Sequence, residues 1–326
     1  MRHMALLPTY QTEEEKRAVF LNCAFCNSEQ EVKGWLEDID VGKFDGAGMS
    51  FRGMTRASYK LYSSLQQAWL KGDLGASHPN PNLLVQGILD AGFQKSVDGT
   101  VLPNGARDDF AMLSYLQHHS CPTPLLDFTS NIRVALYFAT QEPNGPAAGS
   151  DLDDYFSIYI HYPEVIDAMN GGLRKTWLEY SPGHVEETAR WFRSYEMNSL
   201  QETLIFQPEW ISHVYGEGVL NLSTSDRFRL QAGLFAMNNT ADLPFPEAIH
   251  SFVEARTAEE QERRSVRTWI NCLNIKRDHA HLVKTWLAAQ DPPMTKDYLL
   301  PVRVEHGWVK ELFDAVLKQA FEGRLV

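Results

Sequence analysis

Residues 113–140 constrain the fold most, because this short stretch combines a helix end, an apolar strand and a second helix. Leucines at helical spacing predict a helix that brings His118 to its carboxyl end, where Pro122 stops it. Leu125 and Leu126 then predict a brief buried strand. The apolar face of the following helix would consist of Ile132, Ala135, Leu136 and Ala139. The stretch therefore predicts one strand end held between two packed helices.

Polar side chains gather at that predicted strand end. Asp127 and Thr129 would lie at its carboxyl end, and His118 would approach from the preceding helix. A carboxylate, a hydroxyl and an imidazole around one strand end favour a small-molecule site. An Asp before a helix can also be a simple helix cap, and Ser130 or Asn131 are further candidates for that cap. The spacing alone leaves both interpretations open.

Two other segments contain polar residues within apolar surroundings. Residues 51–54 predict an early strand, with Arg52 directed into a cleft and Gly53 allowing a close approach to the backbone. The planar fork of Arg52 suits phosphate oxygens, although an arginine in a surface turn is the simpler alternative. Residues 228–237 predict a buried strand that Gln231 interrupts. That glutamine is either bonded to backbone or functional.

These segments resemble the motifs of the FRG domain family. Its second motif, similar to Q-H-Y-G-x-P-T-R-L-L-D-W-T followed by A-L-Y-F-A, is matched here from Gln117 to Ala139. The first motif stands as Phe51-Arg52-Gly53, and the third, R-x-x-x-Q-x-G-x-F, as residues 227–235. Together the motifs cover roughly residues 32–301. Three positions of the second motif depart from the family pattern: His119, Ser120 and Pro124.

FRG domains in turn look like remote relatives of ADP-ribosyltransferases, which bind NAD in a cleft between two small sheets. The resemblance implies that NAD is the substrate and that Arg52 clamps its pyrophosphate. Asp127 would face Arg52 across one pocket and act near the ribose, and His118 would polarise a group or act as a base. The resemblance further assigns the binding of NAD to Gly53, Tyr59, Thr129 and Tyr137.

Gln231 occupies the late-strand place where transferases of this fold often have a Glu. A glutamine can hold a ribose hydroxyl but cannot act as a base. Gln231 is therefore a candidate catalytic residue only with help from another carboxylate, either Asp127 or Glu202. Otherwise the chain would bind NAD-like ligands without turnover.

The remaining sequence predicts an α+β fold, because helices are many, βα units do not alternate and no G-x-G-x-x-G element occurs. The resemblance refines this to a small split β-sheet core of ADP-ribosyltransferase type with large helical insertions. We expect a helical lead-in over residues 1–31, including a helix that carries Cys23 and Cys26, a domain over 32–301 and a C-terminal helix in 302–326. The other expected helices cover most of 57–92, 177–202, 278–288 and 307–321, and the other expected strands 155–162, 203–207 and 269–275.

Composition limits the partners and the location. A net charge of −12 and a pI near 5.4 argue against a general electrostatic grip on nucleic acid or on anionic membranes. The first residues lack the apolar core of a signal peptide, and no run is long enough for a membrane span, so we expect a cytoplasmic protein. The C-x-x-C pair has no second pair to complete a zinc site, and we interpret it as buried structural cysteines.

Three functions remain open. The first is transfer of ADP-ribose from NAD to a macromolecule, protein or nucleic acid, as a bacterial toxin or phage-defence effector with an antitoxin or other neutralising protein. The second is a module that binds NAD derivatives without catalysis. The third is a metal-dependent hydrolase using His118, His119 and Asp127. It has the least support, because adjacent histidines usually point to different sides and no third spaced ligand is evident.

Overall fold

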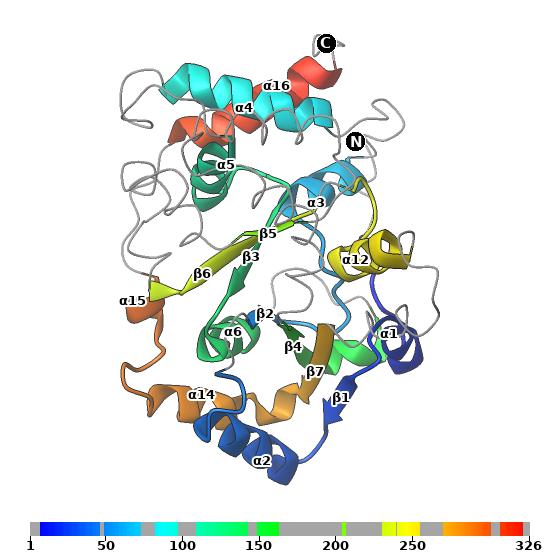
Figure 1. Cartoon of the computed structure of the whole chain (residues 1–326), viewed down its shortest axis with the longest axis vertical. Helices are drawn as coiled ribbons and strands as arrows, with labels where there is room; N and C mark the ends of the chain where they lie inside the picture. Colours follow the sequence, from blue (N-terminus) through cyan, green and yellow to red (C-terminus); the bar gives the residue numbers. More distant parts are fainter. Residues whose placement is uncertain are drawn as a thin grey trace, which may run out of the picture.

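The computed structural model describes residues 7–45, 49–72, 82–96, 109–142, 149–162, 204–206, 230–238, 240–254, 270–300 and 307–321. Within these ranges seven strands form a sheet in the order β1-β7-β4-β2-β3-β6-β5 (Figure 1). The strands are β1 (Cys23–Cys26), β2 (Ser50–Met54), β3 (Leu125–Thr129), β4 (Tyr155–His161), β5 (Leu204–Phe206), β6 (Gly233–Met237) and β7 (Ile270–Lys276). Only the β1–β7 pairing is parallel.

The sheet consists of two halves that meet at one residue pair. Every residue of β2 pairs with β4, and every residue of β3 pairs with β6. Between β2 and β3, however, only Phe51 and Thr129 are in register. Beyond this pair the two strands diverge, and Figure 1 shows the halves turned relative to each other. We call this place the sheet junction.

The helices follow local capping signals. Thr12 caps α1 (Glu13–Val19), Ser28 and Ser63 form capping boxes for α2 (Glu29–Asp40) and α3 (Ser64–Lys71), and Asn131 caps α6 (Ile132–Ala139). The other helices are α4 (Asn82–Ser96), α5 (Asp109–His118), α12 (Phe245–Glu254), α14 (Ala280–Ala288), α15 (Lys296–Leu299) and α16 (Gly307–Phe321).

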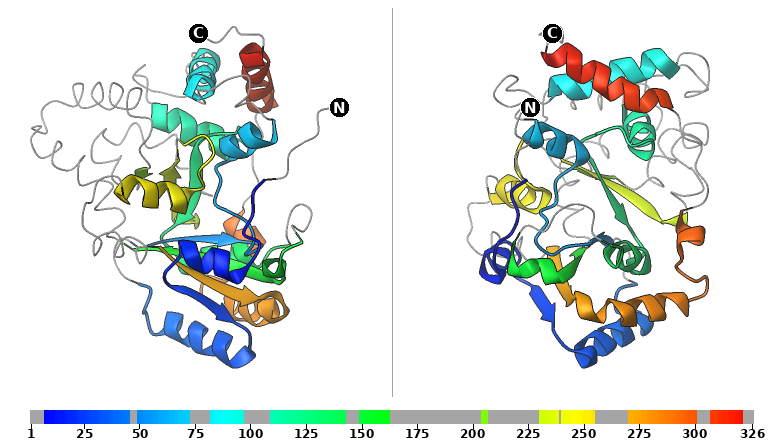
Figure 2. Two further views of the ribbon diagram at one scale, coloured as in Figure 1. Left: turned by 90° about the vertical axis from the view of Figure 1, so that its right-hand side faces the viewer. Right: turned by 180° about the vertical axis from the view of Figure 1, so that it is seen from behind.

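Three groups of buried side chains hold these elements together. One face of the β4 half packs against α2, α6 and α14, and the other packs against α12 and the N-terminal segment. A third group joins α3, α4, α5 and α16 to β3 and β6. Figure 2 shows α4 and α16 at one end of the molecule and α2 and α14 at the other. The sheet junction lies between these ends.

The expectation of an α+β fold is confirmed, and so are the predicted strands around residues 51, 125, 155 and 270. The helical prediction for Cys23 and Cys26 is wrong, because α1 ends at Val19 and these cysteines belong to β1, whose residues pair with β7. A short apolar run fits either structure locally, and pairing with a distant strand decides it. The expected boundary at residue 32 lies inside α2.

Some other predictions differ from the structure in extent. Residues 57–63 are not helical, and the strand predicted over 228–237 begins at Gly233, so that Gln231 precedes it. The helix predicted over 177–202 lies outside the described residues. In the described part of the chain, every helix is too short or too polar to cross a membrane.

Candidate functional site

The sheet junction brings together the three segments that the sequence singled out. Thr129 pairs with Phe51 of β2 on one side and with Gly233 of β6 on the other. Its hydroxyl donates to the carbonyl oxygen of Gln231 at 2.6 Å and accepts from the amide of Asn131 at 3.0 Å. Thr129 therefore connects all three segments and the start of α6.

Arg52 bridges the gap that opens where β2 and β3 diverge. Its Nη1 donates to the main-chain carbonyl oxygen of Asp127, and its guanidinium carbon lies 5.8 Å from the centroid of the Phe128 ring. The Nε of Arg52 is buried and has no hydrogen-bond partner. Burial lowers the pKa of Arg52, while the negative charge of Asp127 opposes this shift. Arg52 thus remains a partly buried cation with a donor to spare.

Asp127 is the one exposed residue of an otherwise buried strand. Its carboxylate accepts a hydrogen bond from Nε2 of Gln117 on α5 at 3.2 Å. The other end of that amide is fixed by Thr123, whose hydroxyl donates to Oε1 of Gln117 at 2.6 Å. Asp127 is not the cap of α6, because the side chain of Asn131 accepts from the first turn of that helix. The simpler helix-cap interpretation of Asp127 is therefore wrong.

Arg52 and Asp127 do not face each other as the sequence predicted. Arg52 contacts the carbonyl of Asp127, whereas the Asp127 carboxylate turns to α5. Side chains alternate along a strand, so this carboxylate lies on the opposite side of β3 from the Phe128 ring beside Arg52. The two charged groups are neighbours separated by the β3 backbone.

Gly53 fixes the position of β2 against α6. A Cβ atom at this residue would lie 1.9 Å from the carbonyl oxygen of Ala135 and 2.8 Å from the amide nitrogen of Ala139. Only glycine permits so close an approach of a helix to the strand. Gly53 thus allows the close approach to the backbone that the sequence predicts, and the group that approaches is helix α6 of the same chain.

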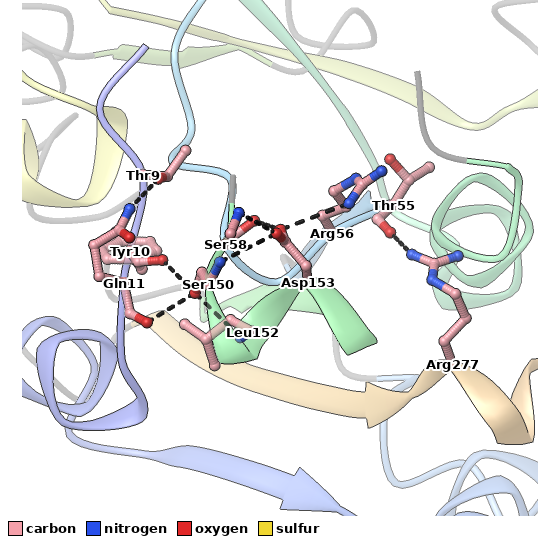
Figure 3. Close-up of polar contacts among 11 residues, drawn as sticks. Thr9, Tyr10, Gln11, Thr55, Arg56, Ser58, Ser150, Leu152, Asp153 and Arg277 are labelled. Carbon is pink, nitrogen blue, oxygen red and sulfur yellow. Dashed lines mark hydrogen bonds and ion pairs between the residues drawn. The ribbon is translucent and has the colours of Figure 1, made fainter. Parts of the chain in front are cut away.

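Polar contacts also anchor the loop that follows β2 (Figure 3). Arg277 donates to the carbonyl oxygen of Thr55. Oδ1 of Asp153 accepts from the hydroxyl of Ser58 at 2.5 Å and lies 3.7 Å from Nη1 of Arg56. With α6 on one side and these contacts beyond it, the backbone around Arg52 is held firmly.

Comparison with known proteins gives one finding for this region. The model of the FRG domain matches residues 47–147. Over these residues the chain resembles FRG domains. No curated protein matches the chain, and no solved structure matches it. The matched range includes β2, β3 and the helices α3 to α6, and therefore both Arg52 and Asp127. Gln231 lies outside the matched range.

Other predicted residues have polar contacts elsewhere in the fold. The side-chain amide of Gln231 donates to the carbonyl oxygen of Leu299 at 2.8 Å. Tyr137 is buried on α6, and burial raises its pKa, with a further contribution from the charge of Asp297. The carbonyl oxygen of Tyr59 accepts from the Tyr159 hydroxyl at 3.3 Å. The side-chain amide of Gln231 and the main-chain carbonyl of Tyr59 are therefore engaged in hydrogen bonds within the fold.

Several candidate groups cannot be placed. His118 ends α5, but its side chain lies outside the described set, and so does Glu202. Among the described side chains, no group of three His, Cys, Asp or Glu residues is arranged to hold a metal ion. Where the family pattern has an arginine, the carbonyl oxygen of Pro124 accepts from the amide of Asn238 at 3.0 Å.

The sequence alone does not single out Gln117, which bonds Asp127, or Ser50 and His161, which pair beside Arg52. Gln117 belongs to the second motif, but the motif alone indicates no role for it. His161 lies in the strand expected over residues 155–162, which is β4 in the structure. The pairing of His161 with Ser50 is a long-range contact that a local sequence pattern does not reveal.

Proposed function

We propose that this chain is an ADP-ribosyltransferase that uses NAD as its substrate and transfers ADP-ribose to a macromolecular acceptor, protein or nucleic acid. The observation that carries the proposal is the spare, buried donor of Arg52 at the sheet junction, with the Asp127 carboxylate nearby across the β3 backbone. The division of the sheet into two halves is in keeping with the NAD-binding folds that FRG domains resemble.

The reaction makes specific demands on these residues. An acceptor atom attacks the anomeric carbon of the ribose, the bond to nicotinamide breaks with its electron pair leaving on nicotinamide, and the acceptor loses a proton. The sugar gains positive charge in the transition state, so the protein must clamp the pyrophosphate and place negative charge near the ribose. Arg52 supplies the clamp. Asp127, whose carboxylate Gln117 orients, supplies the charge.

Gln231 takes a supporting role in this proposal. Its side-chain amide donates to the carbonyl oxygen of Leu299, and its main-chain carbonyl oxygen accepts from the hydroxyl of Thr129. Gln231 therefore connects β3 to α15. The carboxylate that transferases of this fold often place on the late strand is then replaced by Asp127. Thr129 and Tyr137 would line the nicotinamide end of the site, as the family resemblance implies.

Release of nicotinamide from NAD tests the proposal. We expect the wild type to release nicotinamide when an acceptor-containing extract is present, and Arg52→Lys and Asp127→Asn to lose about 100-fold or more of that rate. Asp127→Asn keeps an acceptor for Gln117 and removes only the charge. Arg133→Ala is the matched control, because Arg133 contacts Gln290 and Trp286 on and beside α14 instead of the junction.

The same assay separates the two other functions. A wild type that binds NAD but releases no nicotinamide would contradict catalysis and favour a binding module. Loss of activity on adding a chelator would favour the metal-dependent hydrolase. Because Arg52 also joins the sheet halves, each variant must melt within a few degrees of the wild type for its lost activity to count.

A transferase of this kind would act as a toxin or phage-defence effector and would require a neutralising protein such as an antitoxin. We expect expression of the intact chain to slow bacterial growth, and expression of Arg52→Lys at the same level to have no effect. The growth rate of induced cultures is the measurement. Equal toxicity of both forms would exclude the effector role.

A further inference from the structure

Three polar side chains lie on one face of the β2–β4 pair beside the sheet junction. Ser50 is directly opposite His161 in the register, and Arg52 is opposite Tyr159, one step along the same face. In an antiparallel pair, opposite side chains and their diagonal neighbours are within reach of each other. The ring of His161 lies 4.5 Å from that of Phe128, which also lies beside Arg52. We call Ser50, Arg52 and His161 the junction cluster.

Each member of the junction cluster has polar atoms without a partner. They are the hydroxyl of Ser50, the Nε of Arg52 and both ring nitrogens of His161. Ser50 and His161 are completely buried, each with 0% exposure. A buried polar group without a hydrogen bond costs about 1–3 kcal/mol, so native proteins rarely keep one without a reason. Several such atoms on one patch indicate a site that a ligand completes.

The chemistry of the junction cluster favours an anion. Burial, together with the positive charge of Arg52, lowers the pKa of His161 to about 3, so the imidazole is neutral near pH 7. The cluster then offers N–H groups from Arg52 and His161, a hydroxyl from Ser50 and a net positive charge. Donors with one positive charge match the oxygens of a phosphate group.

We propose that Ser50 and His161 complete the binding site of Arg52 for a phosphate group of the NAD substrate. This inference rests on the proposed function, because it places a particular part of NAD at the junction cluster. NAD, ADP-ribose and inorganic pyrophosphate share the required group. Nicotinamide lacks it.

Variants of the cluster give this inference a distinctive test. In His161→Phe the new ring takes the place of the imidazole between Phe128 and Phe245, whose ring centroid lies 5.3 Å from that of His161. Ser50→Ala removes only the hydroxyl. Without ligand, both variants lose an unpartnered buried group, so we expect Tm to rise by about 1–3 °C. With ligand, we expect the Kd of ADP-ribose and of pyrophosphate to increase about 10-fold or more.

Ser114→Ala is the matched control. Ser114 on α5 is also a buried serine whose hydroxyl has no partner, but it lies outside the junction cluster. We expect its Tm to rise as in Ser50→Ala and its affinity for ADP-ribose to stay that of the wild type. His161→Gln keeps a hydrogen-bond donor and should bind ADP-ribose more tightly than His161→Phe. This comparison separates the loss of the donor from a folding defect caused by the new ring.

Calorimetric titration distinguishes the outcomes. Weaker binding of ADP-ribose and pyrophosphate by Ser50→Ala and His161→Phe, with higher Tm, supports the inference. Wild-type affinity in both variants, or no binding of either probe by the wild type, overturns it. If the wild type binds ADP-ribose through the cluster but releases no nicotinamide from NAD, the transferase proposal fails while the phosphate site stands.

Discussion

Arg52 and His161 are close to each other on one face of the sheet, and the positive charge of Arg52 contributes to the lowered pKa of His161. The Nη1 group of Arg52 donates a hydrogen bond to the main-chain carbonyl oxygen of Asp127, while its Nε remains available to donate to another group. Its neighbour His161 is buried and neutral, with a pKa lowered to about 3. A positive charge on His161 beside Arg52 would have neither solvent nor a carboxylate contact to stabilise it among the described residues.

The pKa of His161 predicts a loss of stability in acid. Between about pH 6.5 and pH 3 the unfolded chain binds a proton at this residue and the folded chain does not, so stability falls as the pH falls. This residue should contribute a loss of about 1 kcal/mol per pH unit across that range. Chemical unfolding of the wild type and His161→Phe at several pH values measures the contribution as their difference. Parallel stability curves would show that His161 titrates normally.

The elements around the sheet junction show which features of the fold are local. Apolar spacing predicted α5 and α6, a capping residue supported the start of α6, and the apolar run with Asp127 predicted β3, because these signals lie within a few residues of each other. The single Phe51–Thr129 pair and the pairing of Ser50 with His161 depend on segments far apart in sequence. Local patterns do not contain that information.

The close contact between α6 and β2 predicts a strong effect at Gly53. Gly53→Ala would place a methyl group within 1.9 Å of the Ala135 carbonyl oxygen, so the helix must move away from the strand. We expect a loss of about 2 kcal/mol or more in unfolding free energy, together with loss of activity because Arg52 shifts. Denaturant unfolding measures the change in unfolding free energy, and release of nicotinamide from NAD measures the change in activity.

Gly34 provides the control for this substitution. It lies exposed on α2, and a Cβ atom there would meet nothing within 4 Å. Gly34→Ala should therefore stabilise the protein by about 0.5–1 kcal/mol, because alanine favours the helix. Equal effects of the two alanines would contradict the packing described for Gly53.

At the scale of the whole molecule, residues 10–26 contribute to the core. Tyr10 and Phe20 are fully buried, and β1 pairs along β7. Lys16 is also completely buried, and its Nζ donates to the carbonyl oxygen of Ala57 at 2.6 Å and to Ser157 at 2.8 Å. Burial lowers the pKa of this lysine. These contacts join the first residues to the middle of the sheet.

This arrangement predicts that the chain does not tolerate truncation at the boundary expected from sequence. A variant that begins at Val32 loses β1 and the buried side chains of Tyr10, Lys16 and Phe20. We expect it to unfold without a cooperative transition, because the face of the sheet that these residues cover would be exposed. Circular dichroism during heating gives the measurement. A cooperative transition within a few degrees of the full chain would show that residues 1–31 are dispensable.

A crystal structure of the protein with ADP-ribose tests most directly whether the sheet junction is the NAD site. We expect a phosphate oxygen within about 3 Å of the Arg52 Nε and of the His161 ring, with the ribose on the side of Asp127. A diphosphate bound at another surface, with the junction cluster still closed and without a ligand, would contradict the proposed site.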